Sequence, residues 1–200
     1  MIRLLIATLI IFLASHFAHA QGEVQMYRDI YKAADSLPRN GRTGVVDTSV
    51  YKLAADLDKE HPAGYFDAAT KFMADRHFNE AAFMFYLGQL RFKYYNATNP
   101  AYKASDDGAL SGALSYVVGE PINMYLRADA DNFIGILHLS LKYYQEHDYK
   151  FFPRSKSPEN YQAQADGISG LIAAIEKDKE QNKQKWAEER QHMEQSFDAM

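Results

Sequence analysis

Apolar residues recur at helical spacing along most of the chain, and the clearest case is the stretch from His61 to Tyr95. Two apolar stripes lie there, separated by the short break Arg76-His77-Phe78-Asn79. Apolar residues at positions i, i+3, i+4 and i+7 predict two helices joined by a tight turn. The second helix carries apolar residues around nearly its whole circumference, which is typical of a helix in the middle of a domain. We therefore expect residues 79–95 to form the core helix.

Further helical patterns precede and follow this pair, and capping or helix-breaking residues separate them. Pro38, Pro62 and the Gly119-Glu120-Pro121 break stop helices, whereas Asp129 and Ser157 can cap the first turn of the next helix. No segment shows the alternation expected of a strand. The sequence therefore predicts an all-α, single-domain bundle of about seven to eight helices. Besides the central pair, the expected helices cover residues 24–37, 48–60, 110–118, 122–126, 133–146 and 158–175.

Bulky and small residues stand at fixed offsets across residues 65–94. The positions concerned are Tyr65, Ala69, Phe72, Phe78, Ala81, Phe85 and Gly88. This order resembles a single tetratricopeptide repeat, and the resemblance implies a right-handed helical hairpin at the core of the domain. The unit departs from the family pattern at Ala68, at Arg76-His77 and at Lys93, where leucine, Gly-Asp and proline are usual. No second copy follows at the period of the repeat, so we expect no superhelical array.

The first 20 residues have the features of an export signal. Arg3 gives a positive start, a ten-residue apolar run follows from Leu4 to Leu13, and Ala18-His19-Ala20 fits a cleavage site. The apolar run is too short to cross a bilayer as a helix, which needs about 20 residues. We expect cleavage after Ala20, a periplasmic or secreted protein and no membrane span in the mature chain. An uncleaved N-terminal anchor is the alternative.

The mature chain divides into a globular part and a polar end. We expect residues 21–175 to form the all-α domain and residues 176–200 to form a charged helical tail. Trp186, Met193 and Phe197 lie at the spacing of one helical stripe in this tail, so it could pair with a second copy in a homodimer. A solvated, fraying helix end is the alternative.

Composition excludes several classes of function. The chain has 22 Lys and Arg against 26 Asp and Glu, and such a mildly acidic protein is a poor ligand for nucleic acid or an anionic membrane. It contains no cysteine, which rules out thiol catalysis, disulfides and cysteine zinc sites. The histidines lack the paired spacing of a metal-binding helix, and the acids after Arg127 lack the glycine and glutamate of a calcium loop. We expect no metal and no cofactor.

Two segments carry candidate binding residues. Tyr94, Tyr95 and Tyr102 lie in an expected tyrosine-rich loop, and Asp106 and Asp107 follow it at a helix start. Exposed tyrosines are favoured in binding surfaces because they offer a large contact area at low entropic cost. Half-buried tyrosines that cover helix ends are the alternative.

The other segment is the break at Glu120, whose carboxylate could serve in a cleft or be an ordinary charge at a helix boundary.

Three classes of function fit these features. The first is a helical protein of the cell envelope that binds another protein, for instance an immunity protein that neutralises an interbacterial toxin. In this reading an acidic and aromatic surface over residues 95–107 docks into a basic cleft. The second is a hydrolase that uses Asp106, Asp107 and Glu120. The third is a carrier of a small apolar ligand. Because no catalytic cluster is present, we favour the binding protein.

Overall fold

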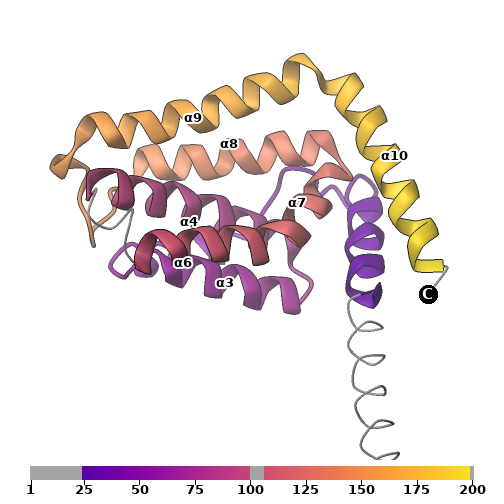
Figure 1. Cartoon of the computed structure of the whole chain (residues 1–200), viewed down its shortest axis with the longest axis horizontal. Coiled ribbons are helices and arrows are strands. Elements are labelled where there is room, and N and C mark those ends of the chain that lie inside the picture. The colour runs from indigo at the N-terminus through magenta and orange to yellow at the C-terminus, as the bar shows by residue number, and fades with distance from the viewer. Residues whose placement is uncertain (1–23, 100–105, 199–200) are drawn as a thin grey trace, which may run out of the picture.

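The computed structural model describes residues 24–99 and 106–198, and these residues form a single helical domain without a strand. The all-α prediction is therefore confirmed (Figure 1). The helices are a first one over residues 24–36, α2 (Ser49–Leu57), α3 (Ala63–Ala74), α4 (Phe78–Thr98), α6 (Asp106–Val117), α7 (Gly119–Arg127), α8 (Ala130–Glu146), α9 (Pro158–Lys177) and α10 (Lys179–Asp198), with a short 3-10 helix at Arg154–Lys156.

The predicted core helix is central in the structure. α4 packs against α2, α3, α6, α7, α8 and α9, and sixteen of its 21 residues are buried. Its closest neighbour is α3, with which it forms a helical hairpin. Gly88 makes this contact possible, since a Cβ at that position would lie 2.6 Å from the Cβ of Tyr65. The expected arrangement of two tightly packed helices around small residues is thus present.

The turn between α3 and α4 has an unusual backbone. Arg76 adopts a φ of 61°, a conformation that glycine tolerates far better than other residues. The amide of His77 donates to the carbonyl of Phe72 at 2.8 Å, which closes the end of α3. Arg76 also forms an ion pair with Asp29 in the first helix. This contact helps to explain why an arginine occupies the position.

A buried ion pair ties α4 to the end of α2. Arg91 is 0% exposed, and its Nη2 lies 2.8 Å from Oδ1 of Asp58. Tyr65 and Tyr143 donate their hydroxyls to the same carboxylate at 2.8 and 3.2 Å. Burial lowers the pKa of the Arg91 guanidinium, but the Asp58 carboxylate together with Tyr161 and Tyr65 outweighs this effect and holds the pKa above its ordinary value. Nothing in the neighbouring sequence of either residue indicates that the two charges are buried together.

Local signals located most helix ends correctly. The carboxylate of Asp129 accepts a hydrogen bond from the amide of Asn132 at 3.0 Å, and Pro158 opens α9, as expected. A break between α6 and α7 is present, but it lies at Val118. Gly119, Glu120 and Pro121, which were expected to form the break, are the first turn of α7, where proline is tolerated because its missing N–H is not needed. Another boundary is wrong: α4 continues to Thr98, so the segment that was expected to begin a loop at Tyr94 is helical.

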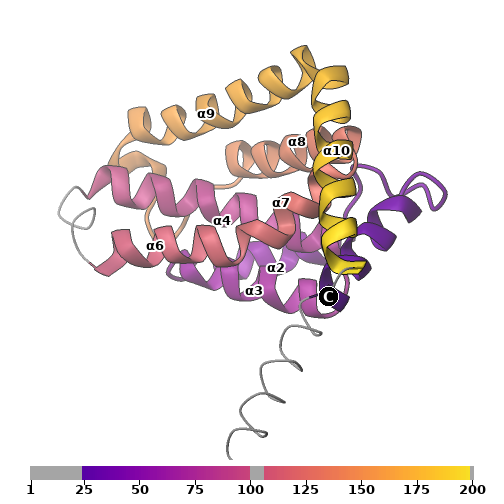
Figure 2. The same cartoon turned by 45° about the vertical axis from the view of Figure 1, so that its right-hand side comes forward.

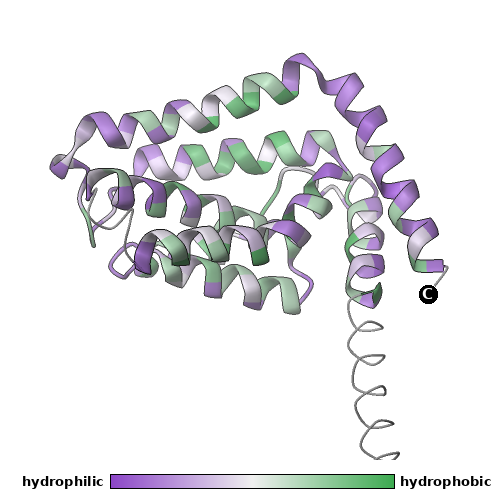
Figure 3. Ribbon diagram, viewed as in Figure 1, coloured by the Kyte–Doolittle hydropathy of each residue, from purple (hydrophilic) through white to green (hydrophobic). Residues whose placement is uncertain are grey.

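The polar end of the chain is a helix that folds back onto the domain. Figures 1 and 2 show α10 turning away from α9 and lying beside the first helix. Although α10 is mostly hydrophilic (Figure 3), Phe197 is buried and stacks on Tyr27 with ring centroids 5.5 Å apart. The expected helix is present, and Trp186 and Phe197 of its apolar stripe pack on the protein's own surface, whereas Met193 is exposed. None of the described helices is long and apolar enough to cross a membrane.

Candidate functional site

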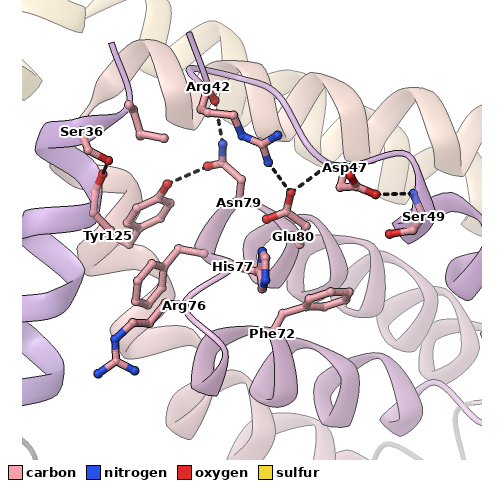
Figure 4. Close-up of a pocket in the computed structure, with 13 residues that line it drawn as sticks. Ser36, Arg42, Asp47, Ser49, Phe72, Arg76, His77, Asn79, Glu80 and Tyr125 are labelled. Carbon is pink, nitrogen blue, oxygen red and sulfur yellow. Dashed lines mark hydrogen bonds and ion pairs between the residues drawn. The ribbon is translucent and has the colours of Figure 1, made fainter. Parts of the chain in front are cut away.

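An open cleft lies where the first helix, the loop over residues 37–48 and the α3–α4 turn meet (Figure 4). Its volume is about 490 Å³, which is within the range of small-molecule sites. Positive, negative and aromatic side chains contribute to its wall. They are Arg42, Asp47, Phe72, Arg76, His77, Phe78, Asn79, Glu80 and Tyr125, together with Ala33, Ser36, Leu37 and Ser49.

A buried amide organises the floor of this cleft. Asn79 Nδ2 donates to the carbonyls of Arg42 and Val45, both at 2.8 Å, and fixes the loop against α4. Its Oδ1 accepts from the Tyr125 hydroxyl at 2.9 Å and from Asn132 Nδ2 at 2.8 Å. Burial raises the pKa of Tyr125 above its ordinary value, so this hydroxyl stays protonated and remains a donor. Every hydrogen-bonding position of the Asn79 side chain is therefore engaged in holding the fold.

Glu80 is the buried acid of the cleft. Its Oε1 accepts from Arg42 Nη2 at 2.6 Å and from the amide of Asp47 at 2.8 Å. The hydrogen bond from the charged guanidinium is of the stronger, charge-assisted kind, and both contacts fix the loop over residues 37–48 to α4. Glu80 also lies in the first turn of α4, where a negative charge is favourable. Its contacts are those of a structural anchor.

The edge of the cleft presents a side chain that could contact a ligand. His77 is exposed at its edge, 6.3 Å from the Phe72 ring between centroids, and could stack on or hydrogen-bond to a ligand. The part of the chain that the structure describes contains no group of three histidine or acidic side chains placed to hold a metal ion.

The predicted tyrosine surface is not formed by Tyr94 and Tyr95. Both lie in the last turns of α4 and are buried, and the Tyr94 hydroxyl donates to the carbonyl of Pro153 at 2.7 Å. Tyr95 packs against the rings of Phe151 and Phe152. They cover the end of the core, which was the alternative that the sequence left open. Tyr102 lies outside the described residues.

The predicted acids lie at separate places. Asp106 is exposed in the first turn of α6, and Asp107 Oδ1 lies 3.4 Å from His61 Nε2 at the start of α3. Glu120 lines a different cleft, next to α10. Glu120 follows Asp106 by 14 residues, and the whole of α6 lies between them. Because a helix rises about 1.5 Å per residue, the length of α6 separates the two carboxylates. The structure thus does not bring these carboxylates into one pocket, as a paired-acid hydrolase requires.

An exposed apolar surface lies on α6, between these acids. None of the 12 residues of this helix is buried, although Leu114 packs against the core. The side chains of Tyr116 and Val117 are 73% and 67% exposed, the highest values among large apolar residues that the structure describes. We call the exposed side of this helix the α6 face, and it comprises Ala109, Leu110, Gly112, Ala113, Tyr116 and Val117.

Gly112 is a second feature of the α6 face, and Gly167 and Gly170 of α9 share it. Glycine inside a helix costs about 0.5–1 kcal/mol relative to alanine. Among the described residues, no atom comes within 4 Å of where a Cβ on Gly112 would be. A methyl group at this position would therefore meet no neighbouring element of the described structure.

Sequence reasoning missed both the cleft and the α6 face. Asn79 and Glu80 follow a turn and look like ordinary first-turn residues, so nothing local indicates their burial. The α6 face was visible only as ten uncharged residues, 108–117, after two acids. Comparison of the chain with protein-family models, with curated proteins and with solved structures gave no match.

Proposed function

We propose that this chain is an exported helical protein that binds another protein, and that the α6 face is the contact surface. The observation that carries the proposal is the exposure of Tyr116 and Val117 on a helix without a buried residue. Contiguous exposed apolar side chains mark interaction sites on soluble proteins, and tyrosine is prominent among the residues that dominate binding energy.

The charges around the α6 face indicate the chemistry of the partner. Asp106 and Asp107 stand at one end of the face and Glu120 follows the other end, whereas residues 108–117 carry no charge. A partner that fits would offer an apolar groove or helix with a basic rim, since opposite charges at a rim guide association. Gly112 and Ala113 would let its backbone approach closely.

The narrower form of the proposal is an immunity or inhibitor protein that neutralises an interbacterial toxin in the periplasm. The expected export signal and the acidic charge are consistent with this role. In this view the tetratricopeptide-like hairpin of α3 and α4 is a scaffold, and α6 is the surface that it holds in place. The reading frames beside the gene would separate this role from other kinds of binding, because an immunity gene is expected beside its toxin gene.

The direct test is site-specific photo-crosslinking in cells of the source strain. A photoreactive residue at Tyr116 should yield one adduct of defined mass in the envelope fraction. The same residue at Leu171, an apolar position that is 37% exposed on α9, is the matched control and should yield none. If neither position yields an adduct, or both yield the same ones, the α6 face is not a specific binding surface.

For the immunity role, a strain that lacks the chain should be killed by wild-type siblings in co-culture. The wild-type gene and Leu171→Lys should restore survival, whereas Tyr116→Lys should not. Equal survival with and without the gene would exclude this role while leaving other partners open.

A small-ligand carrier is the second candidate, and the cleft of about 490 Å³ is the observation that favours it. Its wall mixes ionic and aromatic groups, so a polar ligand with a ring fits better than the apolar ligand that we expected from the sequence. Native mass spectrometry of the purified protein should then show a bound molecule that is lost in His77→Ala. A clean apo mass would count against a carrier. Nothing in the described residues favours a hydrolase.

A further inference from the structure

α10 lies in a groove whose other walls come from the first helix, α7 and α8. Open space remains along its contact with the domain: about 140 Å³ in a cavity lined by Met124 and Met193, and about 340 Å³ in one lined by Asp131 and Ala187. Contacts between α10 and the domain are thus concentrated in a few side chains and do not form a continuous packed interface. Figure 2 shows the helix resting along the edge of the domain.

The contacts that hold α10 recur along one of its faces. The Trp186 ring lies 5.9 Å from that of Phe133. Arg190 binds the Asp35 carboxylate with both terminal nitrogens, at 2.7 and 2.9 Å, and its Cζ lies 4.6 Å from the centre of the Tyr31 ring.

Phe197 completes this set by stacking on Tyr27. Positions 186, 190 and 197 fall on one side of a helix, because they are separated by four and seven residues. The groove therefore recognises a helix with an aromatic residue, an arginine and a second aromatic residue at this spacing.

The anchoring of α10 is weak compared with that of the core helices. Phe197 is its only residue that is buried, and the other side chains are exposed or half-buried. Its further links are exposed ion pairs, such as Arg28 with Asp198 at 2.9 Å and Arg127 with Glu189 at 3.5 Å. Exposed pairs of this kind contribute little to stability.

A single residue separates α10 from α9. Asp178 has φ −106° and ψ 26°, whereas an α-helix has about −63° and −42°. Helical hydrogen bonds continue on both sides, from the Asp178 amide to Ala174 and from the Asn182 amide to Asp178. Rotation at this one residue would join α9 and α10 into a continuous helix about 60 Å long. In that form α10 points away from its own groove.

We propose that two copies of this chain exchange α10, so that the α10 of each copy occupies the groove of the other. The exchanged dimer would keep the contacts of Trp186, Arg190 and Phe197 and would change only the backbone at Asp178. A symmetric exchange of this kind is a low-cost route to a dimer. The proposal is independent of the α6 face, because it uses another surface and another partner.

The test makes use of the absence of cysteine in the chain. The double substitution Arg28→Cys/Asp198→Cys places two thiols at an exposed ion pair, and a short bis-maleimide links them in the full-length mature protein. At high protein concentration, exchange predicts a covalent dimer on a denaturing gel, with a fraction that falls on dilution. Cross-links only within single chains at every concentration would overturn the proposal.

Two variants at Asp178, the residue between α9 and α10, and one at Arg190 distinguish exchange of α10 from other kinds of dimer. Asp178→Ala should raise the association constant of the dimer about tenfold. Alanine favours the helical backbone that the exchanged form needs at residue 178, and this preference over aspartate acts once in each of the two copies. Two glycines inserted after Asp178 should lower it, since they interrupt the continuous helix.

Arg190→Glu should abolish the dimer in light scattering, because glutamate opposes Asp35. A dimer that persists in Arg190→Glu, or that does not respond to the variants at Asp178, would show association through another face and would overturn exchange.

Discussion

α4 and α6 pack against each other and are both rich in apolar residues, yet they relate to solvent in opposite ways. α4 buries sixteen of 21 residues, whereas α6 buries none of 12. The glycines show the same difference, because Gly88 is pressed against Tyr65 while Gly112 meets open space in the described structure. An apolar helical pattern therefore does not reveal whether a helix serves the fold or offers a surface. The following predictions test this contrast.

The largest effect is expected in α4, at Arg91. The substitution Arg91→Met leaves the Asp58 carboxylate buried without its ion partner, and breaking such a pair costs about 3–5 kcal/mol. The free energy of unfolding from urea titrations should fall by this amount. The double variant Asp58→Leu/Arg91→Met removes both charges and should lose less than the single variant. A loss below about 1 kcal/mol in Arg91→Met would mean that the pair is not critical for the core.

In α6, the corresponding prediction is a loss of binding with no loss of stability. Tyr116→Lys should leave the free energy of unfolding within about 0.5 kcal/mol of wild type, because the side chain is 73% exposed. Binding to the partner captured by cross-linking should weaken by about 2–4 kcal/mol, or roughly 30-fold to 1,000-fold. Isothermal titration with Leu171→Lys as the control checks this. Unchanged affinity of Tyr116→Lys would remove α6 from the interface.

The contrast also explains which features could be predicted from the sequence. Helix ends depend on neighbouring residues, so Asp129 as a cap and Pro158 as a first-turn residue located α8 and α9. The ion pair of Asp58 and Arg91 joins residues far apart along the chain, and periodicity carries no information about such pairing. The burial of Tyr94 likewise depends on a segment about sixty residues away.

The candidate sites were predicted only in part, for the same reason. Asp106 and Asp107 indicated the start of a helix, and both lie in the first turn of α6. The apolar pattern of α6 gave no sign of exposure, since the same spacing is typical of a helix that faces a core. Glu80 and Asn79 became part of a cleft only because the loop over residues 37–48 folds over them.

A smaller effect should distinguish the two glycines. Gly88→Ala should destabilise the fold by about 1–3 kcal/mol, because the new methyl group would lie 2.6 Å from the Tyr65 Cβ in a packed core. Gly112→Ala should stabilise it by up to about 1 kcal/mol through helix propensity. Thermal unfolding of both variants measures the difference. If Gly112→Ala is destabilising instead, its surroundings in solution are more crowded than in the described structure.

α10 is intermediate between α4 and α6, because Phe197 is buried against the domain while Met193 of the same stripe is exposed. Asp35 is its principal anchor, and the hydrogen bond from Arg190 lowers the pKa of this carboxyl below its ordinary value of 3.8. A lowered pKa in the folded protein means that the contact stabilises docking above pH 3.8 and loses this effect as the pH falls through the lowered value. Lys179 lowers the pKa of Asp131 in the same way.

The smallest expected effect is therefore an acid release of α10 that precedes loss of the core. Trp186 is the single tryptophan of the chain and packs against Phe133, so its fluorescence reports on α10 alone. Its emission should shift to longer wavelength below about pH 3.8, while far-ultraviolet circular dichroism still shows helix. Asp35→Asn should weaken docking at neutral pH and reduce the size of the acid step. Fluorescence and helicity that change together would mean that α10 is as firmly part of the fold as α4.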